Sequence, residues 1–163
     1  MTTTLSAVAK TLEGISACSG PGSKKQIKDL LADAQEHSVA RFIEAALNPY
    51  KVYGIKKIKQ PEQHTDTDAV DDVFYSMLHS LQTRVVTGGA AMELVTRTLS
   101  LYTKETAFWL MRAIKKDLKA GFSADTFNEA RKGVIGGIRI PVYKCMLAKK
   151  MSDKYVWNFP CQI

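Results

Sequence analysis

Cysteine and histidine are scarce in this sequence, and neither is placed where a metal site or a disulfide framework would need it. Cys18, Cys145 and Cys161 lie far apart and form no CxxC pair, and the three histidines are scattered along the 163 residues. Zinc sites and disulfide-rich domains both depend on close, regular spacing of these residues. The sequence therefore predicts no metal ligands, and it indicates free thiols in a reducing compartment.

Long hydrophobic runs are also missing. No apolar stretch approaches the ~20 residues of a membrane-spanning helix. The first residues, MTTTLSAVAKTLEG, lack the charged start and the long apolar core of a secretory signal. We therefore expect a chain without a membrane partner, located in the cytoplasm.

Signatures of catalysis are equally scarce. The sequence has no HExxH motif, no evident Ser/His/Asp set and no paired catalytic carboxylates. Its glycine-rich stretch GVIGG, at residues 133–137, is neither GxGxxG nor a phosphate-binding P-loop. This stretch is compatible with the hairpin of a helix-hairpin-helix module, although a flexible connection is favoured. On these grounds we predict no catalytic residues and no cofactor site in this chain.

What the sequence does contain is helical periodicity. Apolar residues recur at helical spacing in seven segments, which fall near residues 5–15, 23–34, 39–47, 70–81, 87–99, 103–118 and 123–130. The pattern predicts an all-α protein: a single compact multi-helix domain of about seven helices over residues 1–138, followed by an extended C-terminal linker over residues 139–163.

Helix start and stop signals accompany this periodicity. Ser23 with Gln26 has the spacing of a capping box, and Asp66 or Thr67 is placed to cap the fourth helix. Thr87, Thr103 and Ser123 are expected to begin the last three helices, with Gly121 as the C-terminal cap of the sixth.

The excess of positive charge lies in the last third of the chain. Residues 1–103 contain 11 Lys/Arg and 11 Asp/Glu, whereas residues 104–163 contain 12 Lys/Arg and 5 Asp/Glu, which is the whole net charge of +7. Such a region attracts polyanions. Lysines scattered over a helical domain also serve solubility alone, and the composition leaves both interpretations open.

Two helix starts and a basic stripe are the features best suited to a phosphate backbone. A helix N-terminus offers unpaired N–H groups and the positive end of a dipole, and glycines permit close approach. At helical spacing, Arg112, Lys115, Lys116 and Lys119 lie opposite the apolar face of the sixth helix, and Arg131 and Lys132 extend the patch. The predicted DNA-binding residues are Arg84, Thr87, Gly88, Gly89, Arg112, Lys115, Lys116, Lys119, Gly121, Phe122, Ser123, Arg131 and Lys132.

The segment YKVYGIKK, at residues 50–57, places aromatic residues among lysines. Aromatic rings in such a context stack on sugars or bases, or they pack on the core with the lysine head groups in water. The sequence favours neither interpretation.

Thr87-Gly88, then Lys116-Asp117-Leu118, Lys119-Ala120-Gly121 and Phe122-Ser123 follow one another in order after residue 81. This order resembles that of the motifs in the DNA-binding domain of ATP-dependent DNA ligases. Pro141 followed by Met146-Leu147-Ala148 is similar to the linker that leads into the nucleotidyltransferase domain. The ending WNFPCQI looks like the strand before the adenylation motif KxDG, and ALNPYKVYGIKKI is reminiscent of the phage enzymes.

This resemblance implies a function in nick sealing. The full enzyme would use ATP and Mg²⁺ to attach AMP to a lysine, transfer it to a 5′-phosphate and join that end to a 3′-hydroxyl, in DNA replication and repair. KxDG does not occur in these residues, so the chain would supply only sequence-independent affinity for double-stranded or nicked DNA. Its other implied partners are the ligase's own nucleotidyltransferase and OB-fold domains. We expect a monomer, in the host cytoplasm if a phage encodes it.

Two alternatives come from other classes of protein. One is a helical protein-interaction module whose basic face meets an acidic partner. The other, indicated only by GVIGG and the lysines, is a helix-hairpin-helix DNA repair module that releases a damaged base. Competition between duplex DNA and other polyanions distinguishes the DNA-binding interpretation from the protein-interaction module.

Overall fold

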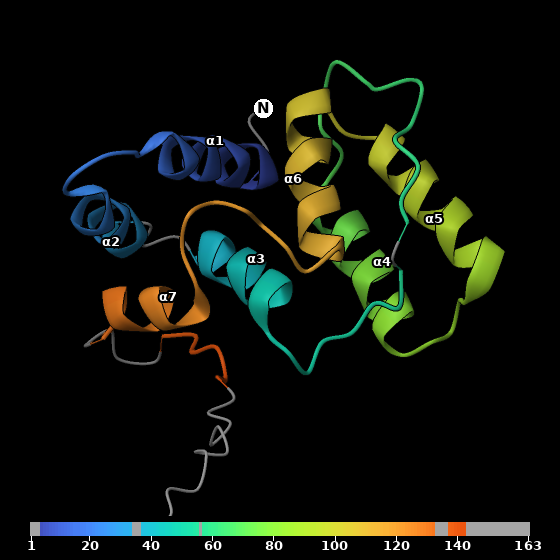
Figure 1. Ribbon diagram of the computed structural model, residues 1–163. Helices are drawn as coiled ribbons and strands as arrows, with labels where there is room; N and C mark the ends of the chain where they lie inside the picture. Colours follow the sequence, from blue (N-terminus) through green and yellow to red (C-terminus); the bar gives the residue numbers. More distant parts are fainter. Residues whose placement is uncertain (1–3, 34–36, 56, 133–136, 143–163) are drawn as a thin grey trace, which may run out of the picture.

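The computed structural model describes residues 4–33, 37–55, 57–132 and 137–142, and these residues form an all-α fold without strands (Figure 1). The described helices are α1 (Thr4–Ala17), α2 (Ser23–Asp33), α3 (His37–Leu47), α4 (Asp71–Gln82), α5 (Gly88–Ser100), α6 (Lys104–Ile114) and α7 (Ala124–Ala130). The predicted fold class is confirmed. The predictions for residues 133–136 and 143–163, including GVIGG and the MLA motif, lie outside the described residues.

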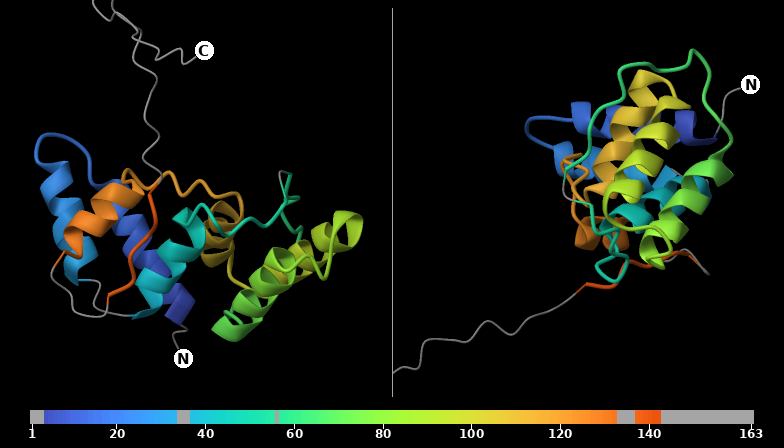
Figure 2. Two further views of the ribbon diagram at one scale, coloured as in Figure 1. Left: turned by 90° about the horizontal axis from the view of Figure 1, so that it is seen from below. Right: turned by 90° about the vertical axis from the view of Figure 1, so that its right-hand side faces the viewer.

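Helix α6 is the centre of the arrangement. It packs on α1, α3 and α5, while α4 packs on α5 at one end of the molecule and α2 packs on α7 at the other (Figures 1 and 2). The helices meet through their apolar faces. The largest fully buried side chains come from each of the seven described helices and from the turn before α6: Leu5, Leu12, Ile15, Leu31, Phe42, Ile43, Phe74, Leu99, Tyr102, Leu110, Ile114 and Phe127. Among the described residues, no helix is long and apolar enough to cross a bilayer.

Two predicted caps are wrong because the helices begin at other positions than the sequence signals indicate. Helix α2 begins at Ser23 itself, and the carbonyl of Gly22 accepts hydrogen bonds from the backbone N–H groups of Lys25 and Gln26. Ser23 is therefore the first helical residue and not the capping residue before it. Helix α4 begins at Asp71 after an extended Val70 with no side-chain cap, so neither Asp66 nor Thr67 caps it.

The end of α6 is a further correction. The apolar spacing predicts a helix through Leu118 with Gly121 as its cap, but α6 ends at Ile114 and Lys115 is its C-cap. Lys116 then adopts a left-handed conformation with φ 62°, which breaks the helical path. Leu118 is still buried. The apolar spacing therefore predicted the burial of Leu118 correctly, but its prediction that the helix extends to this residue was wrong. By contrast, Ser123 caps α7 as predicted and accepts a hydrogen bond from Thr126 N–H at 3.4 Å.

Asp68 ties the segment before α4 to the start of α6. Its Oδ1 accepts a hydrogen bond from the Thr103 backbone N–H at 2.7 Å, and its Oδ2 accepts one from the Thr106 hydroxyl at 2.8 Å. A carboxylate at a helix N-terminus is also favoured by the helix dipole. Thr106 is buried, so this carboxylate satisfies a polar group that water does not reach.

We expect Asp68→Ala to lower the free energy of unfolding by about 1–3 kcal/mol, because the Thr103 N–H and the buried Thr106 hydroxyl lose their acceptors. Urea denaturation followed by circular dichroism measures the change. Asp66→Ala is the matched control, since Asp66 is exposed two residues earlier. Equal urea midpoints for the two variants would contradict the structural role of Asp68.

Candidate functional site

Most of the predicted site residues line three neighbouring hollows on one face of the molecule. The first hollow, here called the groove, contains Thr87 and Gly88 in its lining and shares Ile55 with the second hollow. The second contains Arg112 and Lys115 and shares Lys119 with the third. The third is lined by residues that include Lys116, Gly121, Phe122 and Ser123. The three hollows are therefore contiguous, and they connect Thr87 through Lys119 to Ser123.

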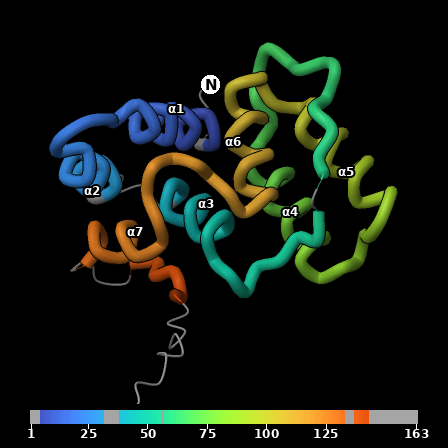
Figure 3. Tube along the Cα trace, viewed as in Figure 1, coloured from blue at the N-terminus to red at the C-terminus, as the bar shows by residue number. Residues whose placement is uncertain are grey.

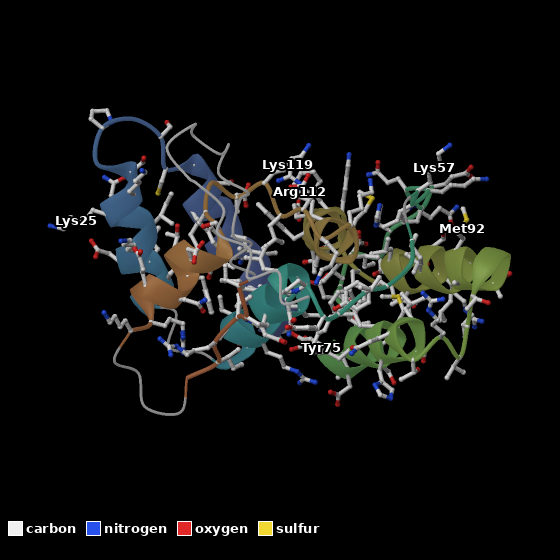
Figure 4. The ribbon with its side chains drawn as sticks, turned by 60° about the horizontal axis from the view of Figure 1, so that its bottom comes forward. Lys25, Lys57, Tyr75, Met92, Arg112 and Lys119 are labelled. Atoms are coloured by element: carbon white, nitrogen blue, oxygen red, sulfur yellow. The ribbon has the colours of Figure 1, made fainter. Side chains whose placement is uncertain are left out.

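The side-chain view supports this placement. Lys119, Arg112 and Lys57 follow one another along one edge of the molecule in Figure 4, away from Tyr75 on the other side. Arg131 and Lys132 are the exceptions among the predicted cations. They follow α7 at the end opposite Ser123 and line none of the three hollows. The predicted extension of the basic patch to these two residues is therefore not part of this face.

The groove has a volume of about 520 Å³ and lies between the start of α5 and the aromatic–lysine loop, by which we mean residues 50–55 with Lys57. Apolar side chains from both segments form most of its walls, and two cations, Lys57 and Arg84, contribute to its lining. The sequence prediction did not commit to Ile55, Lys57 or Met92, which also line it. The alternation of aromatic residues and lysines over residues 50–57 was the signal for this loop.

The start of α5 leaves its first amide groups uncapped. Thr87 is extended, with φ −137° and ψ 167°, and its side chain makes no capping hydrogen bond. Gly88 has φ 62°, and a Cβ at this position would meet no atom within 4 Å. Glycine is therefore needed here for backbone conformation and not for space. Residues 87–90 are exposed, so this helix N-terminus can receive a negatively charged oxygen.

Arg112 is held in a fixed orientation beside the second hollow. Its Cζ lies 4.2 Å from the ring centroid of Phe108 and 5.1 Å from that of Trp109. Its Nη1 donates a hydrogen bond to the Leu118 carbonyl at 3.0 Å. Stacking and this hydrogen bond together pre-organise the guanidinium group, which reduces the entropy lost when it binds an anion.

Lys115 and Lys119 extend into solvent at the same hollow. The Lys119 Nζ lies 3.7 Å from Asp117 Oδ2, and the two side chains are 69% and 57% exposed. An ion pair of this length and exposure contributes little to stability. Both ammonium groups are therefore available to an external anion.

Lys116 has a different environment from its neighbours. It is half-buried, and its Nζ donates hydrogen bonds to the carbonyls of Ala45 at 3.1 Å and Asn48 at 2.5 Å. Burial lowers the pKa of Lys116 to about 8, an effect that Glu44 partly offsets and Lys51 increases. The predicted stripe along one helix face does not exist, because only Arg112 of its four cations lies within α6.

Backbone strain coincides with this face. Within the described residues, the non-glycine residues with positive φ are Arg84 at 56°, Lys116 at 62° and Lys119 at 48°. A left-handed conformation costs about 1–2 kcal/mol for a residue with a Cβ. All three belong to the predicted site. Strained backbone of this kind concentrates at functional sites, where the surrounding structure enforces it.

The face as a whole is suited to binding an anion. Its first two hollows contain the cations Lys57, Arg84, Arg112, Lys115 and Lys119 and a single carboxylate, Asp117. Among the described residues, no group of three or more His, Cys, Asp or Glu is placed to hold a metal ion. What the geometry offers is a row of positive groups beside an open helix N-terminus.

The fold of this chain is shared with solved structures. No family model and no curated protein matches the sequence. A solved structure named Pmar-Lig_PreS3 is similar to 85% of this chain with a TM-score of 0.76 and 22% sequence identity. A second, named Pmar-Lig_Pre., is also similar to 85% of this chain, with a TM-score of 0.73 and 21% identity. The chain spans 32% of the length of each of these proteins, and the likeness establishes a common helical fold.

Proposed function

We propose that this chain binds the sugar–phosphate backbone of duplex DNA, without regard to base sequence, as the DNA-binding domain of an ATP-dependent DNA ligase. The observation that carries the proposal is the gathering of strained cations on one face. Arg84 and Lys119 line neighbouring hollows in left-handed conformations that glycine would adopt at no cost. Cations at such positions are explained if a polyanion binds there.

The chemistry of the face favours contacts with phosphates over contacts with base edges. Phosphates are recognised by Lys, Arg, backbone N–H groups and helix N-termini, and such contacts carry no sequence information. The start of α5 and the side chains of Arg112, Lys115 and Lys119 are groups of these kinds. An enzyme that repairs breaks at any sequence requires this mode of binding.

The assignment to a ligase rests on two independent likenesses. The motifs from Thr87-Gly88 to Phe122-Ser123 follow the order found in ligase DNA-binding domains. Two solved proteins with the same fold carry "Lig" in their names, and this chain spans about a third of their length. In this proposal, ATP, Mg²⁺ and the adenylated lysine belong to a nucleotidyltransferase domain. That domain, an OB-fold domain and this chain would bind nicked DNA jointly.

Fluorescence anisotropy with labelled duplexes of about 20 base pairs tests the proposal. We expect similar affinity for two duplexes of unrelated sequence. If Arg84, Arg112, Lys115 and Lys119 each neutralise a phosphate, log K should fall with log salt with a slope of about −3.6. A nicked duplex of the same sequence shows whether the break itself is recognised.

Competition with polyglutamate of equal charge separates this function from the alternative of a basic protein-interaction face. A DNA-binding domain should prefer the duplex, because amide groups and cations are spaced along a phosphate backbone. Equal competition by polyglutamate would reject the proposal and favour an acidic protein partner.

A further inference from the structure

The C-terminal end of α3 joins the two segments that form much of the candidate face. The Ala45 carbonyl accepts hydrogen bonds from the Tyr53 hydroxyl at 2.8 Å and from the Lys116 ammonium group at 3.1 Å. Tyr53 belongs to the aromatic–lysine loop, and Lys116 belongs to the 115–123 segment that leads to α7. Figure 3 shows both segments leaving the region of this helix end. One carbonyl thus fixes both segments.

Lys116 directs its charge toward the protein. Its Nζ lies at hydrogen-bonding distance from the Ala45 and Asn48 carbonyls and 5.4 Å from the Tyr53 ring centroid. The carbonyls at the end of a helix have no partner within the helix, and they form the negative end of its dipole. A lysine is a favourable partner there.

The charged groups around Lys116 form a compact set. Glu44, on α3, faces it and pairs with Lys51 of the aromatic–lysine loop, the Lys51 Nζ lying 2.5 Å from Glu44 Oε2. The Tyr53 ring covers it from the same loop. On its own segment, Asp117 and Lys119 pair with each other in solvent, and Lys115 is exposed.

The backbone at Lys116 depends on this anchor. Lys116 has φ 62°, and its N–H donates to the Ala113 carbonyl at 3.1 Å, which ends α6 in a tight turn. Lysine does not favour this conformation, and two sets of hydrogen bonds stabilise it: the backbone bond from Asp117 N–H to the Arg112 carbonyl at 3.1 Å, and the bonds of the Lys116 side chain to α3. The direction in which residues 117–123 leave α6 therefore depends on this turn together with the contact between Lys116 and α3.

We infer that Lys116 is a positioning residue, whose ammonium group caps α3 and holds the 115–123 segment against the aromatic–lysine loop, and which does not itself contact phosphate. This inference rests on the proposed DNA-binding function. It differs from the expectation drawn from sequence, which grouped Lys116 with the phosphate contacts. It predicts that Lys116 and Lys119, three residues apart, respond differently to the same substitution.

The first test needs no DNA. Urea denaturation of the wild type and of Lys116→Met is compared at pH 7 and at pH 10. In the unfolded chain, the Lys116 side chain keeps its proton up to about pH 10.5, whereas in the folded protein burial lowers its pKa to about 8. Between these two values the unfolded state binds more protons, so the free energy of unfolding rises with pH. The difference in urea midpoint between wild type and variant should therefore increase toward pH 10. The neutral amine still donates to both carbonyls.

Two further variants make this test decisive. Lys115→Met is the control, because Lys115 is the neighbouring lysine and is exposed. Lys116→Arg keeps a cation and its donors, and it replaces the methionine variant if that chain does not fold. Arginine stays charged at pH 10, so the difference in urea midpoint between the wild type and Lys116→Arg should also increase toward pH 10. Equal midpoints for Lys116→Met and Lys115→Met at both pH values would place the Lys116 ammonium group in water and overturn the inference.

The second test measures DNA binding as a function of salt. Lys119→Met should make the slope of log K against log salt shallower by about 0.9, because a phosphate contact is lost. Lys116→Met should weaken binding by roughly tenfold, because the loosened 115–123 segment must become ordered when DNA binds. Lys115 and Lys119 still reach their phosphates in the bound state, so the slope should stay that of the wild type. A slope reduced as much as in Lys119→Met would make Lys116 a phosphate contact, contrary to the inference, and would leave the proposed function intact. If the wild type binds no duplex, the proposed function fails, and the pH test still decides whether Lys116 caps α3.

Discussion

The double charge reversal Lys115→Glu with Lys119→Glu should weaken binding to duplex DNA by roughly 100-fold at about 0.1 M salt. Both side chains are exposed and line the second hollow beside Arg112. Each lost phosphate contact removes the gain from counterion release, and each new carboxylate repels the backbone. Anisotropy titrations of one duplex at several salt concentrations give both the loss of affinity and the expected flattening of the salt dependence.

The control keeps the change in net charge and moves it elsewhere. Lys24 and Lys25 are exposed on α2, and Figure 4 shows Lys25 well apart from Lys119 and Arg112. Reversing these two charges should weaken binding by less than about threefold, because screening limits charge effects to about 10 Å at 0.1 M salt. Equal losses in the two double variants would show that net charge alone governs binding, and would remove the second hollow from the interface.

The largest expected effect on stability comes from Phe74→Ala, which should lower the free energy of unfolding by about 3–5 kcal/mol. Phe74 is fully buried on α4, and its ring stacks on that of Phe42 on α3 at a centroid distance of 6.0 Å. The substitution leaves a cavity between two helices that the backbone cannot close. Urea denaturation followed by circular dichroism gives the change.

Phe108→Ala makes the same change of side chain at the surface. Phe108 is 42% exposed on α6 and stacks on Arg112. We expect this variant to lose less than about 1 kcal/mol, because little buried area disappears. Similar losses for Phe74 and Phe108 would contradict the burial that the structure assigns to them.

Local sequence patterns were sufficient where a helix is determined by its own residues. Thr87 and Ser123 precede α5 and α7 as predicted. The apolar residues of α5 at helical spacing, among them Ala91, Val95 and Leu99, are buried. In such segments, the start signals and the apolar spacing predict the same helix, and no contact with a distant part of the chain favours another structure.

The end of α6 could not be predicted because it depends on a distant part of the chain. Lys116 finds its hydrogen-bond partners at Ala45 and Asn48, which periodicity within one segment cannot reveal. The left-handed conformations of Arg84 and Lys119 are hidden for a related reason, since neither residue type favours them. The candidate residues were therefore identified largely by motif order, and their geometry required the fold.

The packing of α2 on α7 has a consequence for how this polypeptide acquires its structure on the ribosome. The two helices lie side by side, joined by an ion pair between Lys28 and Glu129 at 2.6 Å, although one is synthesised early and the other late. During translation, the surface of α2 that packs on α7 therefore stays exposed until α7 has been synthesised. Folding intermediates with such exposed surface are prone to aggregate. Nascent chains stalled before Ala124 should accordingly be the ones that chaperones retain.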